Sequence, residues 1–183
     1  TFLKGRVDET SKTLPKLSQS VFLLNQMRGF MKELLVGDNA LSEASLAPLV
    51  ADLLSNDERQ GLWLKRSLEV LDELSEHMEP WNKIIQIDPN DSLANQIPEF
   101  RKNYVNMTGA GLMVLGRIAF EIQKRLAEPN RQLMYRNLAT KIDWRRGGEL
   151  WKGNIVIEGK VLNNRQTVKS ATEKVKEALE LVD

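Results

Sequence analysis

Apolar side chains recur every three or four residues along most of this chain, and this spacing restricts the fold more than any other sequence feature. The longest run repeats about every 3.5 residues and comprises Leu64, Leu68, Leu71, Leu74, Met78, Trp81 and Ile85. Such a run places an apolar seam on one face of a long helix, which packs against a second helix. Pro80 lies inside the run and should end or kink that helix just before Trp81.

The same spacing predicts further helices on both sides of this one. We expect them over residues 18–36, 42–55, 97–122, 130–140 and 164–182. Ser42 or Ser45 can cap the second of these helices, and Asn163 or Asn164 can cap the last. Pro48 is tolerable only in the first turn of its helix.

Three glycines interrupt the predicted helix over residues 97–122. Gly109, Gly111 and Gly116 each cost about 1 kcal/mol relative to alanine, so we expect them to allow a close crossing by a neighbouring helix. The stretch superficially suggests a phosphate-binding loop. It lies within a helical pattern, however, and has no Gly-Lys-Ser/Thr.

The remaining segments are short and extended. Residues 1–16 are polar and form an extended N-terminal segment, while residues 155–157 and Val161 flank Glu158-Gly159 as a two-stranded ribbon around a tight turn. The fold class we predict is mainly α (α+β by strict count), a multi-helix bundle with one small β-hairpin near the C-terminus. The chain should form a single domain over residues 1–183. Because it begins with Thr1 instead of Met, we interpret it as the C-terminal part of a longer protein.

The composition offers little for catalysis. The chain has no cysteine, which excludes disulfides and thiolate chemistry and suits a reducing cytoplasm. Its single histidine, His77, should face solvent, and the acidic helix face formed by Asp72, Glu73, Glu76 and Glu79 should be a hydrated surface. No apolar run is long enough to cross a membrane. We therefore expect a non-enzymatic protein with no catalytic residue, metal or cofactor.

Charge is distributed unevenly along the chain. Residues 1–130 carry 15 Lys/Arg against 18 Asp/Glu, whereas residues 131–183 carry 11 against 7. The second part contains the segment Lys141-Ile142-Asp143-Trp144-Arg145-Arg146-Gly147-Gly148-Glu149-Leu150-Trp151-Lys152-Gly153. Guanidinium groups bind phosphates, and indole faces can stack on bases. Alternatively, both tryptophans anchor the segment in the core and Asp143 pairs with Arg145 or Arg146.

Three segments resemble the C-terminal region of the DGQHR-type family that includes DndB, which is associated with DNA phosphorothioate (sulfur) modification. They are residues 71–81, residues 109–118, and the series Ile142-Asp143-Trp144-Arg145-Arg146, Trp151-Lys152-Gly153 and Gly159-Lys160-Val161. The third resembles the closing pattern of that family, with Arg145 in place of the family's serine. The motif Asp-Gly-Gln-His-Arg that names the family is absent. The family-signature positions carried over are Asp143, Trp144, Arg146, Trp151 and Gly153.

The resemblance implies a DNA-binding transcriptional regulator of a bacterial DNA sulfur modification system. The hypothesis is that DNA phosphates are neutralised by Arg145, Arg146, Lys152, Lys160, Arg165 and Lys169, positioned by Trp144 and Trp151. DNA would then be the partner, either directly or through a missing N-terminal domain. The alternative is a protein-protein interaction or dimerisation module, in which the long-helix seam binds a second copy or another modification-system protein without DNA contact.

Overall fold

The computed structural model describes residues 3–37, 42–88 and 90–181, so residues 1, 2 and 182 of the predicted segments lie outside the described part. The α-helices are α1 (Leu24–Val36), α2 (Glu43–Leu54), α3 (Asp57–His77), α4 (Trp81–Ile84), α5 (Ile97–Asn103), α6 (Gly109–Arg125), α7 (Asn130–Thr140) and α8 (Arg165–Ala178). The 3-10 turns η1 (Ser92–Gln96) and η2 (Val105–Met107) flank α5. The predicted mainly α class is confirmed.

Two small sheets accompany the helices, where the sequence predicted one hairpin. Strands β1 (Val7–Asp8) and β2 (Phe22–Leu23) pair in parallel, whereas β3 (Val156–Ile157) and β4 (Lys160–Val161) form the predicted antiparallel ribbon. Glu158 and Gly159 both have positive φ, as a tight hairpin turn of the I′ kind requires. The missed sheet explains why the first helix begins at Leu24 instead of residue 18: the backbone before it pairs with the segment at Arg6.

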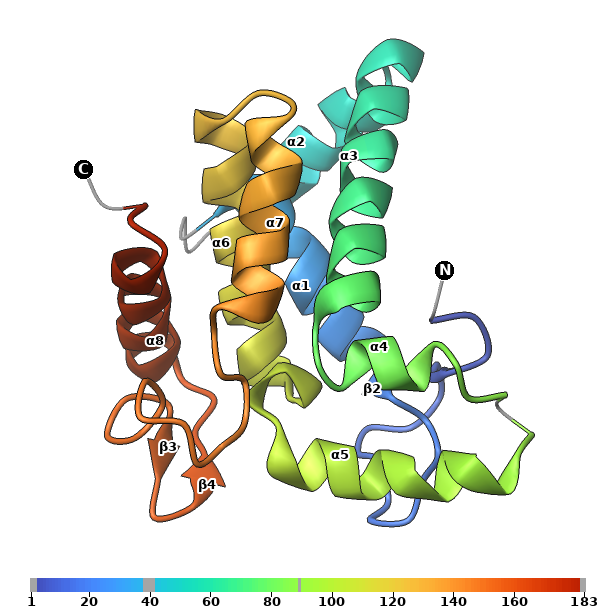
Figure 1. The fold of residues 1–183 in the computed structure, drawn as a ribbon. Coiled ribbons are helices and arrows are strands. Elements are labelled where there is room, and N and C mark those ends of the chain that lie inside the picture. Colours follow the sequence, from blue (N-terminus) through green and yellow to red (C-terminus); the bar gives the residue numbers. More distant parts are fainter. Residues whose placement is uncertain (1–2, 38–41, 89, 182–183) are drawn as a thin grey trace.

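Helix α6 is the centre of the bundle. It packs against α1, α7 and α8 (Figure 1), and most of its side chains are buried. A Cβ at Gly116 would lie 2.7 Å from the carbonyl oxygen of Phe30 in α1. The close helix crossing predicted from the glycines therefore occurs at Gly116.

The prediction of a single helix over residues 97–122 is wrong, because the structure has two separate helices, α5 and α6, in this region. The chain leaves the helical conformation at Tyr104, because its backbone pairs with the segment around Trp144: the Val105 N–H donates to the Trp144 carbonyl (2.8 Å). Helix α6 then starts afresh with the Thr108 hydroxyl capping Gly111. This pairing joins α5 to residues 141–153, which we call the tryptophan–arginine segment, and it positions the candidate site.

Proline and cap positions differ in detail from expectation. Ser42 caps α2, so Pro48 lies in the second turn and not in the first. Pro80 separates α3 from α4, as predicted, and Asn164 caps α8. Helix α8 ends at Ala178, a turn short of the predicted end, because the backbone at Glu180 takes a positive φ.

The long-helix seam divides into two halves. Leu71, Leu74, Met78 and Trp81 are buried in the core, whereas Leu64 and Leu68, nearer the start of α3, are exposed. In the part of the chain that the structure describes, no helix combines the length and apolarity needed to cross a bilayer.

Candidate nucleic-acid interface

Both tryptophans of the tryptophan–arginine segment, Trp144 and Trp151, belong to the core. Trp144 is 3% exposed and Trp151 is fully buried, with their ring centroids 4.9 Å apart. Each indole N–H donates to a backbone carbonyl, Trp144 to Leu138 and Trp151 to Asp143. The interpretation that these indoles stack on bases is therefore wrong, because their faces are covered by protein. Their role is to hold the loop between them in place.

Asp143 and Arg145 form a bidentate ion pair at the start of this loop. The Nε and Nη2 atoms of Arg145 each lie 2.8 Å from a different carboxylate oxygen of Asp143. The hydrogen bonds from Arg145 lower the pKa of the Asp143 carboxyl, despite its partial burial. Arg145 is therefore already partly neutralised, as the core-anchor alternative predicted.

Arg146 has different partners. Its Nη2 donates to the Arg101 carbonyl (2.7 Å), and its backbone N–H donates to the Asn103 carbonyl (2.8 Å). Burial lowers the pKa of its guanidinium group, which nevertheless stays charged at neutral pH. Its buried Nε has no hydrogen-bond partner. Among residues 3–37, 42–88 and 90–181, no carboxylate pairs with Arg146.

Arg101 in α5 repeats this arrangement. Its Nη2 donates to the carbonyls of Pro15, Lys16 and Ser18, at 2.7 to 3.2 Å, and so fixes the N-terminal segment against α5. Burial lowers the pKa of its guanidinium group, and its buried Nε also lacks a partner. Within the described ranges, no carboxylate pairs with Arg101 either. The guanidinium groups of Arg101 and Arg146 are thus not neutralised by a described carboxylate.

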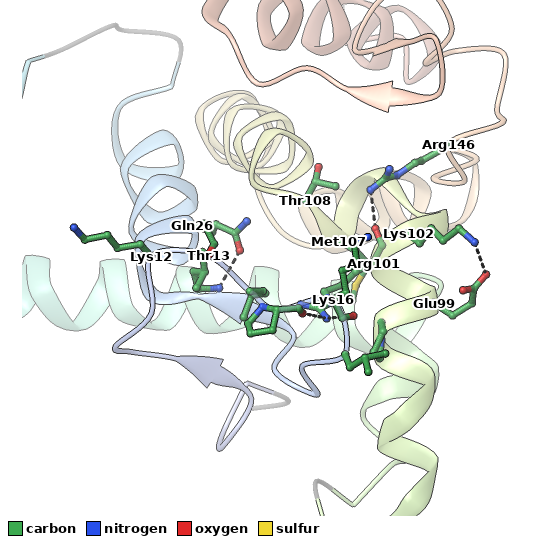
Figure 2. A pocket seen from close by; sticks show the side chains of 15 residues that line it. Lys12, Thr13, Lys16, Gln26, Glu99, Arg101, Lys102, Met107, Thr108 and Arg146 are labelled. Carbon is green, nitrogen blue, oxygen red and sulfur yellow. Dashed lines mark hydrogen bonds and ion pairs between the residues drawn. The ribbon is translucent and has the colours of Figure 1, made fainter.

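These two arginines line a groove of about 800 Å³ between the N-terminal segment, α1 and α5 (Figure 2). We call it, together with the two hollows that Arg146 also lines, the basic groove. Its cations are Lys12, Lys16, Arg101, Lys102, Arg145, Arg146 and Lys160, and its carboxylates are Glu99 and Asp143. Cations therefore greatly outnumber carboxylates along this surface.

The N-terminus of α6 adds to the positive potential of the basic groove. Thr108, Gly109 and Ala110 line the hollow that contains Arg146 and Lys160. The first backbone N–H groups of a helix have no helical acceptor, and the helix dipole is positive at this end. The combined arrangement suits an extended polyanion better than a single small anion.

The structure brings together only some of the residues predicted from the sequence. Arg145, Arg146 and Lys160 line the basic groove, because the β3–β4 ribbon folds back towards the loop. Lys152 pairs with Glu149 outside the lining, and Gly153 occupies a turn with a φ of 72°. Arg165 and Lys169 lie exposed on α8 and do not line the groove.

Sequence reasoning missed four cations of the groove: Lys12, Lys16, Arg101 and Lys102. They lie within residues 1–130, whose overall balance is acidic, so the coarse charge count along the chain concealed them. The pairing of Tyr104 and Val105 with the segment at Trp144 and Arg145 brings α5 to Arg146, and the hydrogen bonds of Arg101 bring the N-terminal segment to α5.

Comparison with known protein families matches residues 1–182 to DndB, described as DNA-sulfur modification-associated. Searches of the curated proteins and of the solved structures gave no match. The family match thus extends beyond the three segments that carry the sequence resemblance to nearly all of the chain, including the N-terminal segment and α5. The chain belongs to the DndB family of DNA-sulfur modification-associated proteins.

Proposed function

We propose that this chain binds the DNA phosphate backbone in the basic groove, as a non-enzymatic DNA-binding regulator of transcription in a DNA sulfur modification system. The observation that carries the proposal is the pair Arg101 and Arg146, two guanidinium groups that line the same groove and whose hydrogen-bond partners are backbone carbonyls and no described carboxylate. Partly buried cations without a counter-charge are expensive unless an anion approaches them. Phosphates supply such an anion at regular intervals.

The groove suits backbone binding more than the reading of bases. Phosphate contacts position a protein on the duplex, whereas bases are read by side chains projecting from an element that enters a groove of the DNA. The cations here come from four separate segments, and two of them, Arg146 and Lys160, line the hollow at the N-terminus of α6. We therefore infer that this chain contributes affinity and that sequence preference, where the system has one, requires further contacts.

A salt titration of duplex binding tests the proposal, with fluorescence anisotropy as the readout. Each phosphate contact contributes about 0.9 to the slope of log K against log salt concentration. The double substitution of Lys16 and Lys102 by alanine should lower the slope by about two. Both lysines are exposed, so the fold should be retained. Lys124→Ala, at the other end of α6, is the matched control and should leave the slope unchanged.

The predicted cations that lie outside the groove, Arg165 and Lys169, allow a test that could contradict the proposal. One contradicting result is that the double substitution of Arg165 and Lys169 by alanine lowers the salt slope, whereas that of Lys16 and Lys102 leaves it unchanged. DNA would then lie on α8, and the groove would not be the binding site. If the wild-type chain shows no salt-sensitive affinity for a duplex, the proposal of direct DNA binding fails entirely.

A further inference from the structure

Helix α2 is strongly apolar, yet it remains uncovered. Only Glu43, Ser45 and Asp52 carry polar side chains along its sequence EASLAPLVADLL. Of its side chains that the structure describes, residues 44–54, none is buried, and Leu49 and Leu54 are about half exposed. Helix α2 packs against the first half of α3, and Arg59 pairs with Asp52 across this hairpin. An apolar hairpin of this kind marks an interaction surface.

The first half of α3 continues the uncovered surface. Leu62, Leu64 and Leu68 are exposed there, although the apolar face of the same helix is buried from Val70 onwards. Gly61 lies among them, and a Cβ added to it would meet no atom within 4 Å. No packing against the described residues explains a glycine at this position, where it weakens the helix. A glycine on an exposed helix face lets another backbone approach closely.

The charges on this face indicate which partner fits. Glu58, Leu62 and Lys65 are four and three residues apart and share one face of α3. Glu58 and Lys65 lie at equal distances on either side of the Gly61-Leu62 step. Neither makes an ion pair with another described residue. If a second α3 lies antiparallel and centred on this step, each Glu58 meets the Lys65 of the other helix.

We propose that a second copy of this chain docks on the α2–α3 surface, defined by Leu49, Leu54, Glu58, Gly61, Leu62 and Lys65. The two hairpins then form a four-helix arrangement related by a two-fold axis through the Gly61-Leu62 step. A two-fold interface requires a self-complementary surface, and the opposite charges of Glu58 and Lys65 around Gly61 meet that requirement. An unrelated partner would not require this internal symmetry.

Sedimentation equilibrium of the whole chain, without DNA, tests the proposal. The wild type should change with concentration from the chain mass of 20.9 kDa towards twice that value. Leu62→Glu and Gly61→Gln should each weaken the dimer by about tenfold or more, because they place a charge or a long side chain at the two-fold axis. Gly61→Gln should also raise the thermal stability of the monomer, since glutamine favours helix.

The matched controls are Leu93→Glu and Gly29→Gln. Leu93 is an exposed leucine in η1, and Gly29 is a glycine of α1 whose Cβ position is likewise open. Neither control should change the association. Circular dichroism checks that every variant keeps its helical content.

Charge reversal separates a second copy from any other occupant. Glu58→Lys and Lys65→Glu should each weaken the dimer, and the chain carrying both changes should recover it, because the contacts are again opposite in sign. A monomeric wild type at all accessible concentrations overturns the proposal. The proposal is also overturned if Leu62→Glu leaves the dimer unchanged, or if the double charge reversal does not restore it. None of these results depends on DNA binding.

Discussion

At the scale of single residues, Asp143 sets how much of the charge of Arg145 is available. The carboxylate holds the guanidinium group bidentately, and the same contact keeps the pKa of Asp143 below its usual value. We predict that Asp143→Asn releases Arg145 and raises the salt slope of DNA binding by about one. Asp72→Asn removes the same charge from an exposed position of α3 and controls for the change in net charge. Equal slopes for the two variants would contradict the prediction.

The site illustrates what could be predicted at this scale. The Asp143–Arg145 pair and the tryptophan core anchors were alternatives open from the sequence, because the residues are neighbours in the chain. The partners of Arg146 could not be predicted from the sequence, because the Arg101 carbonyl lies 45 residues away along the chain. The sequence shows which residues are charged, but long-range backbone pairing decides which charges remain without a counter-ion.

At the scale of elements, the crossing of α1 and α6 requires a glycine. A Cβ at Gly116 would lie 2.7 Å from the Phe30 carbonyl oxygen and 2.8 Å from Cβ of Glu33. We predict that Gly116→Ala lowers the free energy of unfolding by about 1 to 3 kcal/mol, because the helices must separate. Gly29→Ala in α1 meets open space and should raise it by up to about 1 kcal/mol. Urea denaturation measures both, and a stabilising Gly116→Ala would show that the crossing tolerates a methyl group.

The same two helices share a buried ion pair. Arg117 Nε lies 2.8 Å from Glu33 Oε2, and the two side chains are 4% and 9% exposed. We predict that Arg117→Met lowers the free energy of unfolding by about 3 to 5 kcal/mol, because it removes the guanidinium group that pairs with the buried carboxylate of Glu33. Adding Glu33→Met should recover most of the loss in urea denaturation. Additive losses in the two single variants and the double variant would contradict this coupling.

Elements with strong apolar spacing were predictable, and their boundaries failed where distant backbone intervened. The spacing correctly indicated the burial of Leu71, Leu74, Met78 and Trp81, although Leu64 and Leu68 of the same seam are exposed. It also correctly indicated the break at Pro80 and the ribbon at Glu158-Gly159. It extended helices too far through residues 18–23 and across Tyr104, because those segments bond to β1 and to the Trp144 segment instead. Apolar spacing identifies a helix face but does not identify competing backbone partners.

At the scale of the whole molecule, the two proposed surfaces lie at opposite ends of the bundle. Figure 1 shows the start of α3 at one end and α5 with the β3–β4 ribbon at the other. A dimer formed through the α2–α3 surface would therefore carry two basic grooves, one at each far end. Because a two-fold axis relates the copies, the two grooves are identical. Such a dimer can hold two separate duplex segments at once.

This arrangement predicts bridging of DNA. Short duplexes labelled with a donor dye and others labelled with an acceptor dye should show energy transfer when mixed with the wild-type chain. Leu62→Glu should abolish the transfer but keep the salt slope of binding, because each monomer retains its groove. Substituting Lys16 and Lys102 by alanine should abolish the transfer while the dimer persists in sedimentation. A wild-type chain that dimerises and binds duplexes without energy transfer would show that the two grooves face the same segment of DNA, contrary to the geometry of an α3-centred dimer.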